Sequence, residues 1–263
     1  MKHLFILKSY FLFLFRSQSR YSIHSPFVYE LLTKTIKTKE YDDSYQIIKK
    51  LRAELKANNQ FIHIDDFGAG SRNNKALKIK RRVADIAKLT SVRDKYAKML
   101  FRLISHFKPQ TILELGTSLG ISSALFSVAA PKSEIHTIEG SEEILNVAKR
   151  NFSSLELKNI NCTKGLFDDV LPAKLKAINK LDFVFFDGNH RKEPTIKYFE
   201  QCLAYKHNES VFVFDDIHWS EGMEEAWRYI KAHPESIVCI DLFFMGIVFF
   251  KKELSKQEFI YKL

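Results

Sequence analysis

The sequence predicts an α/β protein built on a doubly wound, mostly parallel sheet of seven strands, with a helical extension before it. From Thr111 onward, short apolar runs alternate with amphipathic stretches, which is the alternation of strands and helices in such a sheet. The runs are continuously apolar, as expected for strands buried on both faces. The last two, SIVCIDLFF and MGIVFFKKE, are separated by a turn too short for a helix. These two strands should therefore pair antiparallel.

Length and composition agree with one large domain that has an elaborated N-terminus. The chain has 263 residues, of which 46% are hydrophobic, enough for a sizeable core. We place the helical extension, with a substrate or lid segment, at residues 1–75 and the sheet domain at residues 76–263. Cys162, Cys202 and Cys239 form no CxxC pair. Disulfides and a cysteine zinc site are not indicated, and we expect a reducing compartment, the cytoplasm.

The N-terminus begins with an apolar stretch, LFILKSYFLFLF at Leu4–Phe15. It is shorter than the ~20 residues of a spanning helix and is interrupted by Lys8, and no small-residue cleavage site follows it. A helix packed on the body or on a second subunit in a homodimer is the first interpretation. Peripheral contact of residues 4–15 with a membrane surface is the second, and a cleaved signal stays open.

Residues 27–57 are expected to be helical, followed by a Gly-rich, turn-like connection from His63 to Asn74. Residues 75–108 then hold 11 Lys and Arg against Asp85 and Asp94, a balance of 11 − 2 = +9. We interpret this segment as a solvated face whose cations lie on short helical turns, with nucleic-acid binding as the secondary interpretation. Those cations are Lys78, Lys80, Arg81 and Arg82. A helix should end before Pro109.

Within the sheet domain, five apolar runs precede the terminal pair: TILEL, EIHTIE, NINC, LDFVFFD and SVFVFDD. Helices are expected between them at about residues 121–130, 141–152, 193–206 and 220–233.

The first strand leads into a Gly-rich turn, Glu114-Leu-Gly116-Thr-Ser118-Leu-Gly120. Glycines at a strand-to-helix turn let a ligand approach the backbone, and the helix that follows offers free N–H groups. Glu139 ends the next strand, 23 positions after Gly116, where an acidic residue can hold ribose hydroxyls. The pattern predicts a nucleoside-binding site.

The turn lacks the middle glycine of the dinucleotide fingerprint, because Ser118 stands there. That glycine admits a pyrophosphate, which a nucleoside without phosphates does not need. Glu114 beneath the turn suits a ligand with an ammonium group. The residues therefore favour S-adenosylmethionine over NAD.

Taken in order, ILELGTSLG, IHTIEG, the turn that begins at Gly165, FVFFDGNH and VFVFDD resemble the class I S-adenosylmethionine-dependent methyltransferases. The pattern is most similar to the catechol-type small-molecule O-methyltransferases. The resemblance covers about residues 95–250 and implies a Rossmann-like sheet. The first 75 residues do not match that subgroup.

By matched position, the resemblance implies two sets of residues. The cofactor set is Glu114, Gly116, Ser118 and Gly120 for the methionine part, Glu139 for the ribose, Phe167 and Asp168 near the adenine, and Asp187. The second set holds a Mg²⁺ ion or another divalent cation through oxygen ligands and consists of Asp187, Asp215 and Asp216. Phe167 is alternatively a core aromatic, and Asp168 a helix cap.

The residues for proton removal follow the fourth strand, in Asp187-Gly188-Asn189-His190. The family places a general-base lysine where this chain has His190, and a histidine accepts a proton near neutral pH more readily than a lysine. We assign catalysis to His190 with Asp187, and His218 is the alternative base. The carboxylates at the strand ends could instead bind only cofactor or brace the following helix.

These expectations predict a cytoplasmic transferase that moves a methyl group from S-adenosylmethionine to an oxygen, or less readily a nitrogen, of a small-molecule acceptor. The alternatives are an RNA or protein methyltransferase and a non-catalytic nucleoside-binding protein that kept the fold. The acceptor is not identified by the sequence.

Overall fold

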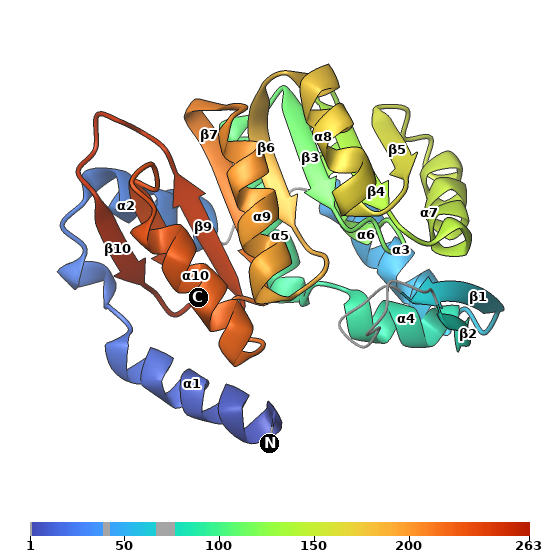
Figure 1. Cartoon of the computed structure of the whole chain (residues 1–263), viewed down its shortest axis with the longest axis horizontal. Coiled ribbons are helices and arrows are strands. Elements are labelled where there is room, and N and C mark those ends of the chain that lie inside the picture. Colours follow the sequence, from blue (N-terminus) through green and yellow to red (C-terminus); the bar gives the residue numbers. More distant parts are fainter. Residues whose placement is uncertain (1, 39–42, 67–76) are drawn as a thin grey trace. The chain divides into compact units, whose positions relative to one another are not determined.

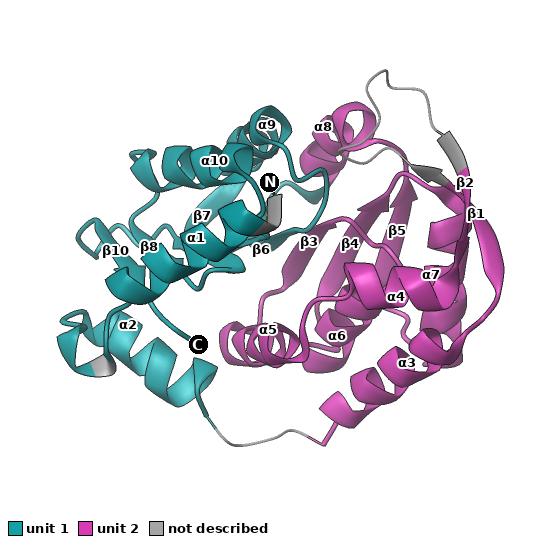
Figure 2. Cartoon of the chain, turned by 90° about the horizontal axis from the view of Figure 1, so that it is seen from below, with its two compact units in different colours: residues 1–38, 178–263 teal, residues 39–177 magenta. Residues whose placement is uncertain are grey.

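The computed structural model describes residues 2–38, 43–66 and 77–263, and these fall into two compact units. Unit 1 comprises residues 1–38 and 178–263, and unit 2 comprises residues 39–177 (Figure 2).

Unit 2 carries the first three strands of the parallel sheet together with a two-stranded ribbon. Its elements are α3 (Tyr45–Ala57), β1 (Phe61–Asp66), β2 (Leu77–Arg82), α4 (Val83–Thr90), α5 (Asp94–Phe107), β3 (Thr111–Leu115), α6 (Ile121–Ala129), β4 (Glu134–Glu139), α7 (Glu142–Ser154), β5 (Ile160–Lys164) and α8 (Phe167–Ile178).

Strands β3, β4 and β5 lie side by side in this order, and both pairings are parallel. Their carboxyl ends therefore share one edge, and β4 is the middle strand. Helix α8 lies on one face of these strands, and α5 and α6 on the other (Figure 2). Buried aliphatic side chains such as Ile112, Leu113 and Ile135 form the core between the layers. This edge is where open α/β sheets bind ligands.

Unit 1 carries the remaining strands and the N-terminal helices. Its elements are α1 (Lys2–Arg16), a short 3₁₀ turn (Arg20–Ser22), α2 (Pro26–Glu30), a π-helical turn (Leu31–Ile36), β6 (Leu181–Phe186), α9 (Lys192–Leu203), β7 (Lys206–Asp215), α10 (Glu221–Ala232), β8 (Val238–Asp241), β9 (Met245–Phe249) and β10 (Gln257–Ile260).

The strand order in unit 1 is β6-β7-β9-β8-β10. Figure 1 labels β6, β7, β9 and β10. Strand β6 pairs parallel with β7, whereas β9 pairs antiparallel with both β7 and β8. Phenylalanines dominate its core: Phe186 and Phe214 stack face to face with ring centroids 4.3 Å apart. Gly246 of β9 leaves room for Trp227, because a Cβ there would lie 2.6 Å from the indole.

The predicted α/β, doubly wound and mostly parallel fold is confirmed, including the antiparallel terminal pair, which is β8 and β9. The strand number differs. Besides the β1–β2 ribbon, the described residues contain eight strands, because β10 adds a strand parallel to β8. Helices α6, α7, α9 and α10 lie where they were expected, and α5 ends two residues before Pro109.

One local prediction was wrong: residues 78–82 are not helical turns. They belong to β2, which pairs antiparallel with β1, so that His63 faces Lys80 in the register. Of the expected turn-like connection, residues 63–66 belong to β1 and residues 67–74 lie outside the described part of the chain. The division of the chain at residue 75 stays a prediction. Among the described residues, no helix is long and apolar enough to cross a membrane.

Candidate functional site

The Gly-rich turn lies between β3 and α6 and is held against the neighbouring strand β4. The backbone N–H groups of Gly116 and Thr117 both donate to the carbonyl of Ile138, at 3.1 and 3.2 Å. Gly116, Ser118 and Gly120 all have positive φ, at 111°, 47° and 80°. The turn therefore follows a path that favours glycine, and it brings backbone amides to the carboxyl edge of the sheet.

Gly120 has a packing reason of its own. It precedes α6 in the left-handed conformation, and a Cβ added there would lie 2.5 Å from the ring of Phe152 on α7. This glycine thus permits close contact between the turn and a helix, in addition to any role toward a ligand.

Glu139, the last residue of β4, directs its carboxylate at the Gly-rich turn. Its Oε2 accepts a hydrogen bond from the Ser118 N–H at 3.0 Å, and its Oε1 accepts one from the Ser141 N–H at 2.9 Å. Burial raises the pKa of this carboxyl, and the backbone N–H groups oppose the rise without cancelling it. Glu139, the predicted ribose-binding residue, therefore contacts the predicted Gly-rich turn directly at the end of β4.

Glu114 is fully buried among hydroxyl groups. Its Oε2 accepts hydrogen bonds from Ser123 and from Thr137, the latter at 2.6 Å, and Thr137 in turn lies 2.6 Å from the Thr117 hydroxyl. Burial raises the pKa of Glu114 to about 7, against the opposing hydrogen bonds from serine and threonine. A contact of this carboxyl with the methionine part of a cofactor stays a prediction.

Phe167 and Asp168 begin α8, directly after the β5 loop. The N–H of Gly165 donates to the carbonyl of Glu139 at 2.9 Å, so this loop is tied to the end of β4. The structure thus brings together the turn, Glu139 and the start of α8 within unit 2. Their roles toward ribose and adenine stay predictions.

The predicted catalytic and metal residues lie in unit 1. Register pairs Phe186 of β6 with Phe214 of β7, so Asp187 and Asp215 are the next residues at adjacent parallel strand ends. Asp216 follows with a φ of 54° and begins the turn to α10. Within the described part of the chain, no group of three or more His, Cys, Asp or Glu side chains is arranged to hold a metal ion. The residues present do not fit the predicted three-carboxylate metal site.

His190 does meet its predicted partner. Its Nε2 lies 3.7 Å from the Asp187 Oδ1, with 25% and 15% of the two side chains exposed. The loop between them is fixed by Asn189, whose amide donates to the Tyr198 hydroxyl at 3.2 Å and accepts from the Arg191 Nε at 2.7 Å. An imidazole beside a carboxylate, partly open to solvent, is an arrangement that can accept a proton.

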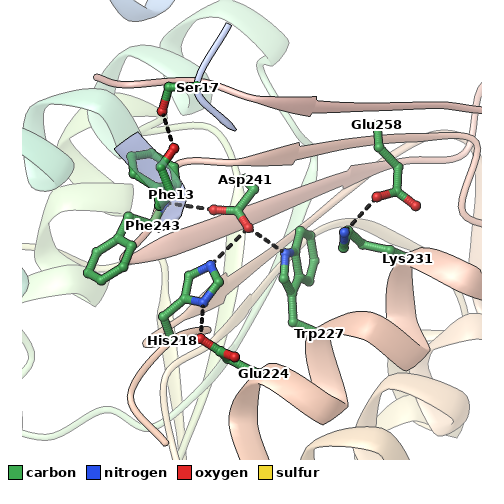
Figure 3. A network of polar contacts seen from close by, with 9 residues as sticks. All are labelled: Phe13, Ser17, His218, Glu224, Trp227, Lys231, Asp241, Phe243 and Glu258. Carbon is green, nitrogen blue, oxygen red and sulfur yellow. Dashed lines mark hydrogen bonds and ion pairs between the residues drawn. The ribbon is translucent and has the colours of Figure 1, made fainter. Parts of the chain in front are cut away.

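His218, the alternative base, is occupied by two carboxylates (Figure 3). Its Nδ1 lies 2.8 Å from Glu224 and its Nε2 2.9 Å from Asp241, which also accepts from the Trp227 indole. Burial lowers the pKa of His218, but the hydrogen bonds with Asp241 and Glu224 outweigh it and raise the pKa to about 9. At neutral pH the ring is a cation that donates from both nitrogens, so it is not available as a base.

Several polar residues of these clusters were not identified from the sequence. Thr137 interrupts the apolar run EIHTIE, and Ser123 lies in the first turn of α6. A hydroxyl within an otherwise apolar run was the available signal. Asp241 ends the run SIVCID in the same way, as a buried acid at a strand end that requires a partner.

Residues 113–217 match a family model described as a methyltransferase domain. This segment runs from β3 to just past β7 and contains the turn, Glu139, and the His190–Asp187 pair. The chain carries a methyltransferase domain. This domain makes the chain an enzyme of the transferase class, and the methyltransferase resemblance of the sequence is confirmed.

Solved structures share the fold of this methyltransferase domain and much of the rest of the chain. An O-methyltransferase from Bacillus cereus in complex with SAH is 17% identical, with a TM-score of 0.55, over 84% of this chain and 96% of its own. The O-methyltransferase TomG from Streptomyces achromogenes, in complex with SAM, is 15% identical with a TM-score of 0.55, over 85% and 95%. The SAH-bound methyltransferase PaMTH1 from Podospora anserina is 12% identical with a TM-score of 0.58, over 88% and 98%.

Proposed function

We propose that this chain transfers a methyl group from S-adenosylmethionine to an oxygen, or less readily a nitrogen, of a small-molecule acceptor. The observation that carries the proposal is the Glu139 carboxylate, which accepts from the backbone N–H groups of Ser118 and Ser141 at the carboxyl edge of the sheet and lies within the matched segment. The solved O-methyltransferases with SAM or SAH bound support the choice of cofactor and of acceptor atom.

The residues of unit 2 fit a nucleoside cofactor without phosphates. The turn supplies backbone N–H groups but has Ser118 in place of the central glycine, and Glu139 is suited to two neighbouring ribose hydroxyls. Phe167 begins α8, two residues after Gly165, whose N–H donates to the Glu139 carbonyl. S-adenosylmethionine supplies, when bound, an already activated methyl group on a positively charged sulfur. The protein then needs to align the acceptor and remove its proton.

His190 is the proposed proton acceptor, with Asp187 stabilising the imidazolium that forms. The 3.7 Å separation between them is the contact that supports this role. We propose no step through a metal ion, because the carboxylates present do not form a suitable group.

The cytoplasm is the proposed location, supported by the three free cysteines, Cys162, Cys202 and Cys239.

Calorimetric titration with S-adenosylmethionine tests the cofactor. We expect Glu139→Ala to weaken binding by about 1 to 3 kcal/mol, because the ribose hydroxyls and the Ser118 N–H lose their buried acceptor. Glu134→Ala is the matched control: it removes an exposed carboxylate from the opposite end of the same strand and should leave binding unchanged.

Binding of NAD by the wild-type protein, with no response to S-adenosylmethionine, would contradict the proposal. A label-transfer screen with hydroxylated small molecules, RNA and protein then tests the acceptor class. Tight cofactor binding without transfer to any acceptor would favour the non-catalytic alternative, and transfer confined to RNA or protein would replace the small-molecule acceptor.

A further inference from the structure

Helix α1 presents an apolar face to solvent. Its exposed positions are 4, 7, 8, 11, 12, 15 and 16, a spacing that places them on one side of a helix. Five of these seven are large and hydrophobic, with the following exposed fractions: Leu4 72%, Leu7 51%, Phe11 63%, Leu12 48% and Phe15 91%. The outer face of a helix on a protein surface is normally polar, so this helix has the reverse pattern.

The inner face of α1 is fixed to unit 1 by specific contacts. Phe13 is 5% exposed and lies against Phe243, with ring centroids 5.3 Å apart, and Tyr10 meets the same ring edge-on at 4.8 Å. The Ser9 hydroxyl hydrogen-bonds Glu224; burial raises the pKa of this carboxyl, and the hydrogen bonds from His218 and Ser9 more than offset it. The helix is thus docked through Ser9, Tyr10 and Phe13, and it leaves its other apolar side uncovered.

The charged residues of the N-terminal segment indicate what kind of partner contacts the exposed apolar side of α1. The other two exposed positions are Lys8 and Arg16, and residues 1–29 contain no Asp or Glu, since the first acidic residue is Glu30. A two-fold pairing of this face with a second copy would bring these cations together with no acidic residue of the helix to oppose them. An anionic surface with an apolar interior matches both the exposed apolar side chains and the flanking cations.

We propose that α1 attaches the chain to an anionic membrane surface by lying parallel to it. Phe11, Phe15 and the exposed leucines enter the boundary between headgroups and acyl chains, and Lys8 and Arg16 contact anionic headgroups. At 15 residues the helix lies on the bilayer and does not span it. This inference is independent of the proposed methyl transfer.

Vesicle flotation of the full chain tests the proposal. We expect binding to phosphatidylcholine vesicles with about 30% phosphatidylglycerol, little binding to pure phosphatidylcholine, and release by salt. Phe11→Ser with Phe15→Ser should lower partitioning at least about tenfold, because two large apolar side chains no longer leave water. Lys8→Gln and Arg16→Gln should each lower it about fivefold.

Leu89→Ser is the matched control, since Leu89 is 74% exposed on α4 and should not affect partitioning. Unchanged binding of S-adenosylmethionine or an unchanged unfolding midpoint shows that the double variant is folded. Equal flotation of the wild type and the double variant, equal binding to neutral vesicles, or no vesicle binding overturns the proposal. A lipid-free dimer that the double variant converts to a monomer assigns the face to a second copy and also overturns it.

Discussion

At the scale of single residues, the candidate site depends on acids whose surroundings set their charge. Glu139 and Glu114 lie on neighbouring strands, yet Glu139 accepts from backbone N–H groups at the strand end while Glu114 accepts from hydroxyls inside the sheet. The sequence predicted both as ligand-facing. It could not distinguish them, because the difference arises from which neighbouring side chains, such as Thr137 and Ser123, fill the space around each carboxyl.

Glu114 should make the stability of the protein depend on pH. Its pKa is raised from 4.5 to about 7, so the folded state holds this proton more tightly than the unfolded state. Its contribution is fully present below pH 4.5 and is lost as pH rises through 7, a change of up to about 3 kcal/mol. Glu114→Gln keeps the shape but cannot ionise, so we expect the variant to gain stability relative to the wild type over this range.

Urea unfolding at several pH values, without cofactor, measures this difference. Glu143→Gln removes an exposed carboxyl from α7 of the same unit and should give a difference that does not change with pH. A constant difference between Glu114→Gln and the wild type would show that the buried carboxyl does not titrate in this range.

At the scale of elements, helices and strands with long, regular patterns were predicted well, and short or charged ones were not. Strand β10 is only four residues long with Phe259 as its buried side chain, too few for a period to be recognised. Strand β2 reads LKIKRR; its cations suggested a solvated helix, whereas alternate residues of an antiparallel ribbon also face solvent. In both cases pairing with another segment decides the structure.

The conformation and packing of Gly120, in the turn before α6, predict that a substitution there lowers stability. Gly120→Ala places a Cβ 2.5 Å from Phe152 at a φ of 80°, so conformational strain and overpacking should together cost about 2 to 5 kcal/mol of unfolding free energy. Gly222→Ala is the control, because Gly222 lies within α10 and its nearest contact is 3.5 Å away. Alanine there should be neutral or stabilise the helix by up to about 1 kcal/mol. Chemical unfolding that ranks the two variants equally would contradict this explanation.

At the scale of the whole molecule, the predicted roles divide between the two compact units. The turn, Glu139 and the start of α8 belong to unit 2, and the His190–Asp187 pair belongs to unit 1. The sequence did not predict this division, because it placed all of these residues in one sheet domain, residues 76–263. It also did not predict that the described residues would contain no group of three or more His, Cys, Asp or Glu side chains arranged to hold a metal ion.

Methyl transfer should accordingly depend on His190 and not on a metal ion. We expect His190→Gln to lower turnover by about 10²- to 10⁴-fold, because glutamine cannot accept the acceptor's proton, while cofactor affinity in titration stays unchanged. Transfer by the wild type should persist in excess chelator.

The matched control is His207→Gln. His207 lies 2.7 Å from Asp182 at the amino ends of β7 and β6, whereas His190 and Asp187 follow the carboxyl end of β6. The control therefore breaks a similar histidine–carboxylate pair away from the site and should leave turnover intact. Loss of transfer in chelator that added Mg²⁺ restores would return the strand-end carboxylates to the role of metal ligands. Equal turnover of His190→Gln and the wild type would remove His190 as the base, because the Asp187 contact would then serve only to shape the loop.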